Sequence, residues 1–168
     1  MAVTLYVWKN SPSEVGHASL DVDGVYISFW PKGAANAKKD VKIGEMHDAA
    51  YPSSYAVDRK IERREADVKV MLDNLDEKAI KAFWQAFKDK SEQYNMLKSN
   101  CSTVTAMALE AGSGLASNRS PSIKISDYVS NTGMQWLLKV RFMGNYIQMW
   151  TPNDVLTYAL QIKSQSIF

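Results

Sequence analysis

The sequence has a single cysteine and lacks the features of a disulfide-stabilised or membrane-spanning chain. One cysteine in 168 residues cannot form an internal disulfide, so we expect folding that needs no oxidising compartment. No run approaches the roughly 18 apolar residues that cross a bilayer, which predicts no stable membrane insertion. The start MAVTLYVWKN lacks the basic and apolar regions of a signal peptide. We therefore expect synthesis in the cytoplasm, with any secretion or delivery to a target cell following another route.

The sequence also has little excess of charge of either sign, and it lacks the usual ligand-binding motifs. The formal net charge is +2, and basic residues are interleaved with acids, so no nucleic-acid partner is expected. No Cys/His cluster has zinc spacing and no glycine-rich loop would hold a phosphate, so we expect neither a metal nor a cofactor. The large aromatics are expected in the core or along a groove rather than on a nucleotide-stacking platform: Trp30, Trp84, Trp136 and Trp150.

The first part of the chain predicts β-structure. Residues 4–8, 17–22 and 25–30 are β-rich runs, and Asp23-Gly24 between the last two is a strong hairpin signal. This hairpin would place His17 on one strand and Ser28 on the other. Residues 31–54 are expected to form a surface excursion that could act as a lid, with His47 as a surface residue.

The middle of the chain predicts one charged segment, one strand and one helix. Residues 58–65 are heavily charged, and we expect them to be solvated. Alternation over 66–72 predicts a half-buried strand. Asn74, with Glu77 three residues later, would cap a helix. Its apolar stripe comprises Ile80, Phe83, Trp84 and Phe87.

Two further helices are predicted from their end signals. One would begin near Asn100 and end at Gly112, a residue type common just after a helix. Its expected buried face comprises Val104, Met107, Ala108 and Ala111. The other would begin at Thr151-Pro152 with Asp154 in its first turn. Its core-facing residues would be Val155, Ala159 and Ile162. Residues 134–150 fit no single pattern.

Cys101 is the candidate nucleophile. It lies in Ser99-Asn100-Cys101-Ser102 at the expected start of a helix, where the helix dipole and backbone N–H groups favour a thiolate. Asn100 would cap and position this turn, and N–H groups there, including that of Ser102, could hold an oxyanion. The alternative is that Cys101 is a small buried hydrophobic residue, as free cysteines often are.

His17 is the candidate base. A thiol nucleophile needs a base within hydrogen-bond reach, and His17 would serve if the fold brings it to Cys101. The alternative is a hydrogen-bonded structural histidine in a strand.

Three segments in this order carry a resemblance to a known superfamily: Gly16–Leu20, Asp23–Ser28 and Tyr94–Cys101. They resemble the permuted branch of the NlpC-type papain-like cysteine hydrolases, which includes relatives of lecithin:retinol acyltransferase. The likeness covers roughly residues 3–30 and 92–112, and residues 150–154 also resemble bacterial members.

The resemblance implies a single α+β domain over 1–168. Its antiparallel sheet would pack on a helical part, with the nucleophile at a helix N-terminus and the histidine preceding the cysteine. His17 takes the base position, Cys101 the nucleophile position and Ser28 the orienting position.

Ser28 departs from the superfamily's pattern, because relatives often have His, Asn, Gln or an acid there. A serine hydroxyl can orient the imidazole but supplies no negative charge. Asp21 and Asp23 are alternatives. Asp21 shares a strand face with His17 but would lie roughly 13 Å along the strand.

We therefore predict a cysteine hydrolase, a peptidase or amidase that cleaves an amide in a protein or peptide-containing substrate. The likeness to small bacterial effectors, such as those of type VI secretion, implies a secretion apparatus or a host protein as a partner. Two alternatives stay open. One is an inactive papain-like interaction module, and the other is a thiol acyltransferase or lipid esterase.

Overall fold

The chain has a mixed α+β fold built on one antiparallel sheet, as the sequence predicted. A computed structural model describes residues 3–10, 15–34, 44–118, 121–128, 132–141 and 143–165. The sheet has the order β3-β2-β1-β7. Its strands are β1 (Val3–Trp8), β2 (His17–Val22), β3 (Val25–Ile27) and β7 (Val68–Leu72). Each neighbouring pair is antiparallel.

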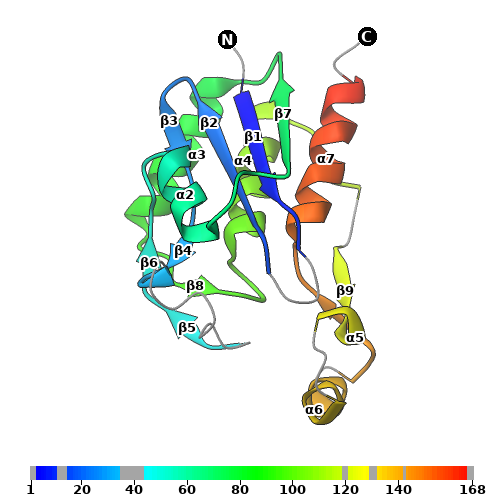
Figure 1. Cartoon of the computed structure of the whole chain (residues 1–168). Coiled ribbons are helices and arrows are strands. Elements are labelled where there is room, and N and C mark those ends of the chain that lie inside the picture. Colours follow the sequence, from blue (N-terminus) through cyan, green and yellow to red (C-terminus); the bar gives the residue numbers. More distant parts are fainter. Residues whose placement is uncertain are drawn as a thin grey trace.

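Helices cover both faces of this sheet (Figure 1). Behind it lie α3 (Glu77–Asp89) and α4 (Cys101–Ser113), with α7 (Pro152–Gln165) beside β7. In front of β2 and β3 lies the short helix α2 (Tyr55–Glu62). Alternate residues of β1, namely Val3, Leu5 and Val7, join the main core with the helices behind the sheet. The opposite face of the sheet is therefore the one that α2 covers.

The β2–β3 hairpin confirms the Asp23-Gly24 turn. Both residues have positive φ, 48° and 77°, as a two-residue hairpin turn requires. The strand after the turn is shorter than predicted. β3 ends at Ile27, so Ser28 follows the strand instead of lying on it. β3 pairs only with Leu20 to Val22, so no described strand pairs with the first residues of β2 on that edge.

Residues 31–54, predicted to form a surface excursion, contain short paired strands. β4 (Trp30–Pro31) pairs with β6 (Ala49–Ala50), and β5 (Met46–His47) pairs with β8 (Tyr94–Asn95). Residues 35–43, where a lid was considered, lie outside the described residues.

The start of α3 and the end of α4 differ from prediction by two residues each. Asp76, not Asn74, caps α3 and accepts from the Ala79 N–H, while Asn74 has a φ of 62° in the preceding turn. Helix α4 continues past Gly112 to Ser113, and Gly114 adopts the left-handed conformation. Gly112 instead permits close helix packing, because a Cβ there would lie 2.5 Å from Ile80.

Most of the predicted buried faces are confirmed. Ile80, Trp84 and Phe87 of α3 are buried, and Phe83 packs against the core while partly exposed. In α4, Val104 and Ala108 are buried, but Met107 is exposed. Helix α7 begins as predicted, with Thr151 and Asp154 exchanging hydrogen bonds. Its residues Val155, Ala159 and Ile162 are buried.

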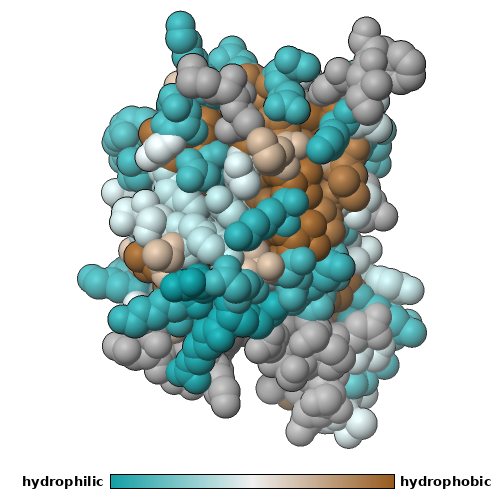
Figure 2. All heavy atoms as spheres, turned by 45° about the horizontal axis from the view of Figure 1, so that its top comes forward, coloured by the Kyte–Doolittle hydropathy of each residue, from teal (hydrophilic) through white to brown (hydrophobic). Residues whose placement is uncertain are grey.

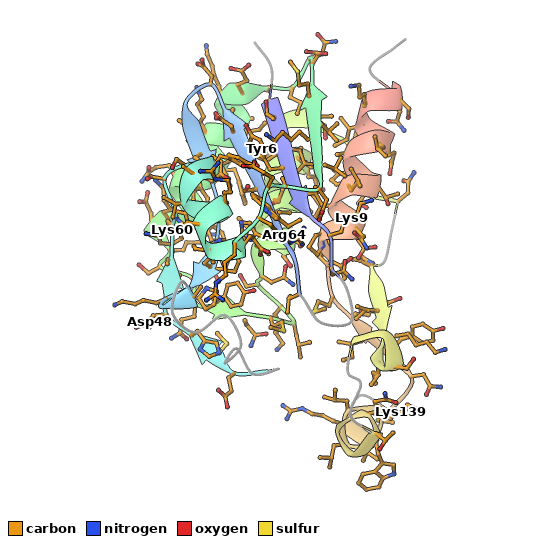
Figure 3. The ribbon with its side chains drawn as sticks, in the orientation of Figure 1. Tyr6, Lys9, Asp48, Lys60, Arg64 and Lys139 are labelled. Atoms are coloured by element: carbon orange, nitrogen blue, oxygen red, sulfur yellow. The ribbon has the colours of Figure 1, made fainter. Side chains whose placement is uncertain are left out.

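The prediction that residues 58–65 are solvated was wrong in one decisive respect. Asp58 and Glu62 are buried within α2, whereas Arg59 and Lys60 are exposed. Lys60 projects from the front of the molecule in Figure 3. The charged run is therefore a helix with two faces, and its inner face carries acids.

Helix α2 is fixed to the end of β1 by the segment that follows it. The Trp8 indole N–H donates to the Arg64 carbonyl at 3.0 Å. The Arg64 guanidinium donates to the Lys9 carbonyl and to Asp67, and Figure 3 shows Arg64 and Lys9 near the lower end of β1. The Lys9 N–H in turn donates to Asp67 at 2.7 Å. These contacts hold the helix that carries Asp58 against the sheet.

The segment that projects from the lower right of the fold in Figure 1 includes residues 134–150, which fit no single pattern in the sequence. It contains β9 (Ser122–Lys124), α5 (Ile125–Tyr128), α6 (Thr132–Arg141) and β10 (Tyr146–Gln148), and β9 pairs with β10. Trp136 of α6 is 64% exposed, so the expectation of a core or groove position was wrong for this residue.

The surface differs between faces. Figure 2 shows an apolar area on the side where β7 and α7 lie, and a more polar surface over α2. Among the described residues, no helix has the length and apolarity needed to cross a bilayer.

Candidate active site

His17 begins β2 and is fully buried between two tryptophans. Its ring stacks on Trp30 with centroids 4.2 Å apart and an interplanar angle of 20°. Trp8 lies 5.5 Å away on a tilted ring plane. The residue before it, Gly16, has a φ of 72°, and a Cβ there would lie 2.3 Å from the Trp8 carbonyl oxygen. Only glycine fits that close approach, so Gly16 fixes where the strand and His17 begin.

Asp58 reaches His17 from the front helix. Its Oδ2 lies 3.0 Å from His17 Nε2 and accepts from the Tyr26 hydroxyl at 2.8 Å. Its Oδ1 accepts from the Ser28 hydroxyl at 2.9 Å and from the Trp30 indole N–H at 2.8 Å. Four donors thus surround one buried carboxyl group. This is the arrangement that stabilises an ionised carboxylate, which only accepts hydrogen bonds.

This network assigns the histidine tautomer. Because Asp58 accepts from every neighbour, His17 Nε2 carries the proton and donates it to Oδ2. Ser28 Oγ lies 3.1 Å from the same nitrogen and can act as the second, weaker acceptor of a bifurcated hydrogen bond from this N–H. The other nitrogen, Nδ1, is buried and has no hydrogen-bond partner of standard geometry among the described residues. In the neutral ring Nδ1 is a proton acceptor, and it is the nitrogen left for Cys101.

Cys101 is the first residue of α4, as predicted. Asn100 caps the helix, and its Oδ1 accepts from the Thr103 N–H at 2.8 Å. Its side-chain nitrogen donates to the carbonyls of Met96 and Trp150 at 2.8 and 3.0 Å. All polar atoms of the Asn100 side chain are therefore used in positioning the helix start. Asn100 is a positioning residue here, not a side-chain donor for an oxyanion.

The backbone at the start of α4 offers N–H groups with the geometry to bind an anion. Among the described residues, the N–H groups of Cys101 and Ser102 have no acceptor, in keeping with the first turn of a helix. The Ser102 hydroxyl lies 3.9 Å from the Cys101 sulfur. Both side chains are nearly inaccessible to solvent, with Cys101 5% exposed.

The open edge of β2 is where the helix meets the strand. Thr105 Oγ1 lies 3.1 Å from the Ala18 carbonyl oxygen and 2.8 Å from that of Cys101, so its single proton is shared between them. A hydrogen bond from the Ala18 backbone lowers the pKa of the Cys101 thiol. The N–H and C=O of one strand residue point to the same side, so Ala18 directs both toward α4. In the part of the chain that the structure describes, no strand blocks this contact, because β3 pairs only from Leu20 onward. The helix thereby brings Cys101 around the sheet edge toward the face that carries His17.

The electrostatics of the three residues favour charged forms. Burial lowers the pKa of His17, but Asp58 and Cys101 outweigh it and raise that pKa to about 10. Burial raises the pKa of the Cys101 thiol, but the charge of His17 and hydrogen bonds from His17, Ala18 and Ser102 lower it below its usual value. The pKa of Asp58 is lowered in the same way: burial raises it, and His17, Tyr26 and Trp30 more than compensate. The site is thus arranged for a thiolate and an imidazolium beside a carboxylate.

The other sequence candidates lie elsewhere. Asp21 pairs with Tyr26 across the hairpin, and Asp23 forms an ion pair with Lys81. His47 lies in β5 and is half-buried, rather than on the surface as expected. No group of histidines, cysteines and acids in the described residues could hold a metal ion.

Sequence reasoning brought His17, Ser28 and Cys101 into consideration but missed Asp58. A signal was present. Asp58 lies three residues after Tyr55 and three before Ile61, on one helical face that also includes Glu62. This spacing aligns the acid with apolar residues, but it does not show which face of the helix turns inward.

One comparison with known proteins gives a match. The family model of the IcsB middle domain matches residues 45–124, which include Asp58 and Cys101 but not His17 or Ser28. The searches of curated proteins and of solved structures gave no significant match.

Proposed function

We propose that the chain is a cysteine-dependent acyl-transfer enzyme that hydrolyses an amide through Cys101, His17 and Asp58. The observation that carries the proposal is the tautomer fixed by Asp58. With Nε2–H donated to the carboxylate, the lone pair of Nδ1 is available to accept the thiol proton. A histidine buried only for packing needs no ionised carboxylate held by three other donors.

The reaction follows from these positions. Cys101 loses its proton to His17 Nδ1, and the thiolate forms a C–S bond with the substrate carbonyl carbon. The N–H groups of Cys101 and Ser102 bind the resulting oxyanion. His17 returns the proton to the leaving amine as the C–N bond breaks, which leaves a thioester. Water then attacks, His17 accepts its proton, and the acid and the free thiol are released.

Asp58 takes the role that the sequence gave to Ser28. It holds the ring orientation and stabilises the imidazolium, while Ser28 bridges the His17 ring and Asp58 Oδ1. The papain-like kinship with permuted order belongs to this proposal. It is supported by a strand histidine that precedes a cysteine at a helix start. Delivery as an effector also belongs to it, and the match to the IcsB middle domain supports that part.

One observation favours a second candidate, acyl transfer to an acceptor other than water. Cys101 is 5% exposed and His17 is fully buried. Exclusion of water slows hydrolysis of a thioester intermediate. A bound amine or hydroxyl acceptor would then take the acyl group with the same proton movements at His17.

The first experiment measures the thiol pKa of Cys101 from the pH dependence of iodoacetamide labelling. As the chain has one cysteine, the reaction reports on this residue alone. We expect a midpoint well below the ordinary value of about 8.5. His17→Ala should move the midpoint up. A wild-type midpoint at the ordinary value would favour an inactive interaction module.

The second experiment measures turnover of an aryl amide, an ester and an acyl thioester, with and without an added amine acceptor. Cys101→Ala should abolish every activity. Met107→Ala is the matched control, because Met107 lies on the same helix and is 45% exposed. Turnover retained in Cys101→Ala would refute the proposal. Faster thioester consumption with the amine, and formation of the amide product, would select the transferase.

A further inference from the structure

Helix α6 presents apolar side chains outward. Leu138 is buried against the core, whereas Trp136, Leu137 and Val140 are 64%, 54% and 59% exposed. At 3.6 residues per turn the three exposed residues fall within an arc of about 100°. We call this surface the α6 face. An ordinary surface helix has the reverse distribution, with its apolar stripe facing the core.

Neighbouring residues extend the exposed apolar surface. Met143, two residues beyond the helix, is the most exposed large apolar residue described, and Tyr146 of β10 is also exposed. Single exposed apolar residues are common, but five within a stretch of eleven indicate an interaction surface.

The two charges on α6 are both positive, and the Arg141 guanidinium lies close to Gly44, which precedes Glu45. Lys139 and Arg141 follow Trp136 by three and five residues, which places them on the two sides of the apolar arc. Lys124 lies opposite Tyr146 in the β9–β10 pair. The sequence has no acid between Asp127 and Asp154. Figure 3 shows Lys139 on the projecting α6, at the lower right of the molecule.

We propose that the α6 face binds the surface of an anionic lipid bilayer. An exposed Trp-Leu-Val surface flanked by cations is the composition of a helix that lies in the membrane interface. The apolar residues would enter the acyl boundary, and Lys139 and Arg141 would contact lipid phosphates. A neutral protein groove would match the apolar arc but not the basic residues on α6 that flank it. The contact is peripheral, because α6 has 10 residues and a span needs about 20.

This docking would orient the candidate active site. The starts of β2 and α4 lie at the same lower end of the fold as α6 (Figure 1), and they carry His17 and Cys101. A protein held by the α6 face would present that end toward the bilayer. The binding itself is independent of the proposed chemistry and is tested without any turnover.

The test is co-sedimentation of the full chain with vesicles. We expect binding to phosphatidylcholine vesicles containing roughly one-third phosphatidylserine to be about tenfold or more tighter than to pure phosphatidylcholine. Added salt should weaken it. Trp136→Ser/Val140→Ser should lose most of the binding, and Lys139→Glu/Arg141→Glu should remove the preference for phosphatidylserine.

Matched controls separate the α6 face from general surface effects. Met107→Ser/Leu160→Ser removes two exposed apolar residues from other helices, and it should bind as the wild type does. Lys78→Glu/Lys90→Glu makes the same change in net charge at exposed positions of α3 and its end, and it should keep the lipid preference. Circular dichroism of each variant checks that the fold is retained.

Tryptophan fluorescence gives a second readout in the wild-type chain. Trp8, Trp30 and Trp84 are buried and Trp150 is half-buried, whereas Trp136 is 64% exposed, so Trp136 is the tryptophan most able to change its environment. Its emission should move to shorter wavelength when anionic vesicles are added. Trp136→Phe should still bind but lose that shift.

Three results would overturn the proposal. These are no binding to anionic vesicles, binding that the α6 variants leave unchanged, and a dimer in solution that the same variants dissociate. The last result would assign the α6 face to a second copy of the chain.

Discussion

The Asp58 carboxylate lies 3.0 Å from the His17 ring, although 41 residues separate them, and neither side chain is exposed to solvent. The contact joins the front helix to the sheet, and Cys101 reaches the same ring from the helix behind. The candidate site therefore depends on three layers being correctly packed.

Removing the charge of Asp58 should affect the thiol more than removing the Ser28 hydroxyl. Asp58→Asn takes away the negative charge that raises the pKa of His17, so the Cys101 midpoint in iodoacetamide labelling should rise. Turnover should fall by about 100-fold or more. Ser28→Ala leaves the direct Asp58 contact in place, and its loss of turnover should stay near tenfold.

The prediction would be contradicted if Asp58→Asn and Ser28→Ala changed turnover and the labelling midpoint equally, or if Ser28→Ala changed them more. Either would return the orienting role to Ser28. Asp21→Asn is the control, because Asp21 lies in the hairpin away from the ring and should leave both readouts unchanged.

The buried Asp58 should also shape the acid stability of the protein. Its pKa is lowered in the fold, mainly by His17 against the cost of burial. Asp58 therefore stabilises the fold at pH values above its pKa in the unfolded chain, about 4. This contribution to the free energy of unfolding is lost as the pH falls below that pKa. Removing one partner of a buried pair costs roughly 3–5 kcal/mol, so Asp58→Asn should be much less stable at pH 7.

Urea unfolding from pH 7 to pH 3 measures this effect. The difference in the free energy of unfolding between the wild type and Asp58→Asn should become smaller toward pH 3. A difference that is constant with pH would mean that Asp58 is protonated in the fold.

His17 gives the alkaline limit of activity. Its pKa is raised to about 10, so the imidazolium persists through neutral pH and is lost as the pH approaches that value. Turnover should therefore fall on the alkaline side near pH 10 rather than near the ordinary histidine value of about 6.5. A pH–rate profile of kcat/KM tests this. An activity that rises steadily through pH 10 would remove His17 from the mechanism.

Local patterns in the sequence were enough to predict the elements that carry His17 and Cys101. The Asp23-Gly24 turn defined the hairpin, and Asn100 defined the start of α4, because both signals act within a few residues. They could not show that β3 ends at Ile27 and leaves Ala18 free to meet α4. That depends on how far the hairpin pairs, which tertiary packing decides.

Asp58 was missed for a related reason. In a run of charged residues, the sequence does not show which face of a short helix turns inward. Burial of that acid is possible only because Tyr26, Ser28 and Trp30 each donate a hydrogen bond to it. All three donors lie at alternate positions after the hairpin turn, so one face of that segment supplies all three hydrogen bonds to the carboxylate. The acid and its donors are separated by about 30 residues, a spacing that no local pattern reports.

Thr105→Val tests the contact between α4 and the strand edge. The substitution keeps the shape but removes the hydroxyl whose proton is shared between the carbonyls of Ala18 and Cys101. The buried carbonyl is left unsatisfied, which should cost about 1–3 kcal/mol in urea unfolding. Because the Ala18 N–H helps to lower the pKa of Cys101, loosening this contact should also raise the labelling midpoint.

Thr157→Val is the control for this last prediction. Thr157 is exposed on α7, and its hydroxyl donates only within its own helix, to the Asn153 carbonyl. It should change neither stability nor labelling appreciably. If Thr105→Val lowers stability but leaves the Cys101 midpoint in place, the strand edge holds the helix without tuning the thiol. If both shift, the edge of β2 left open by the short β3 is itself part of what activates the cysteine.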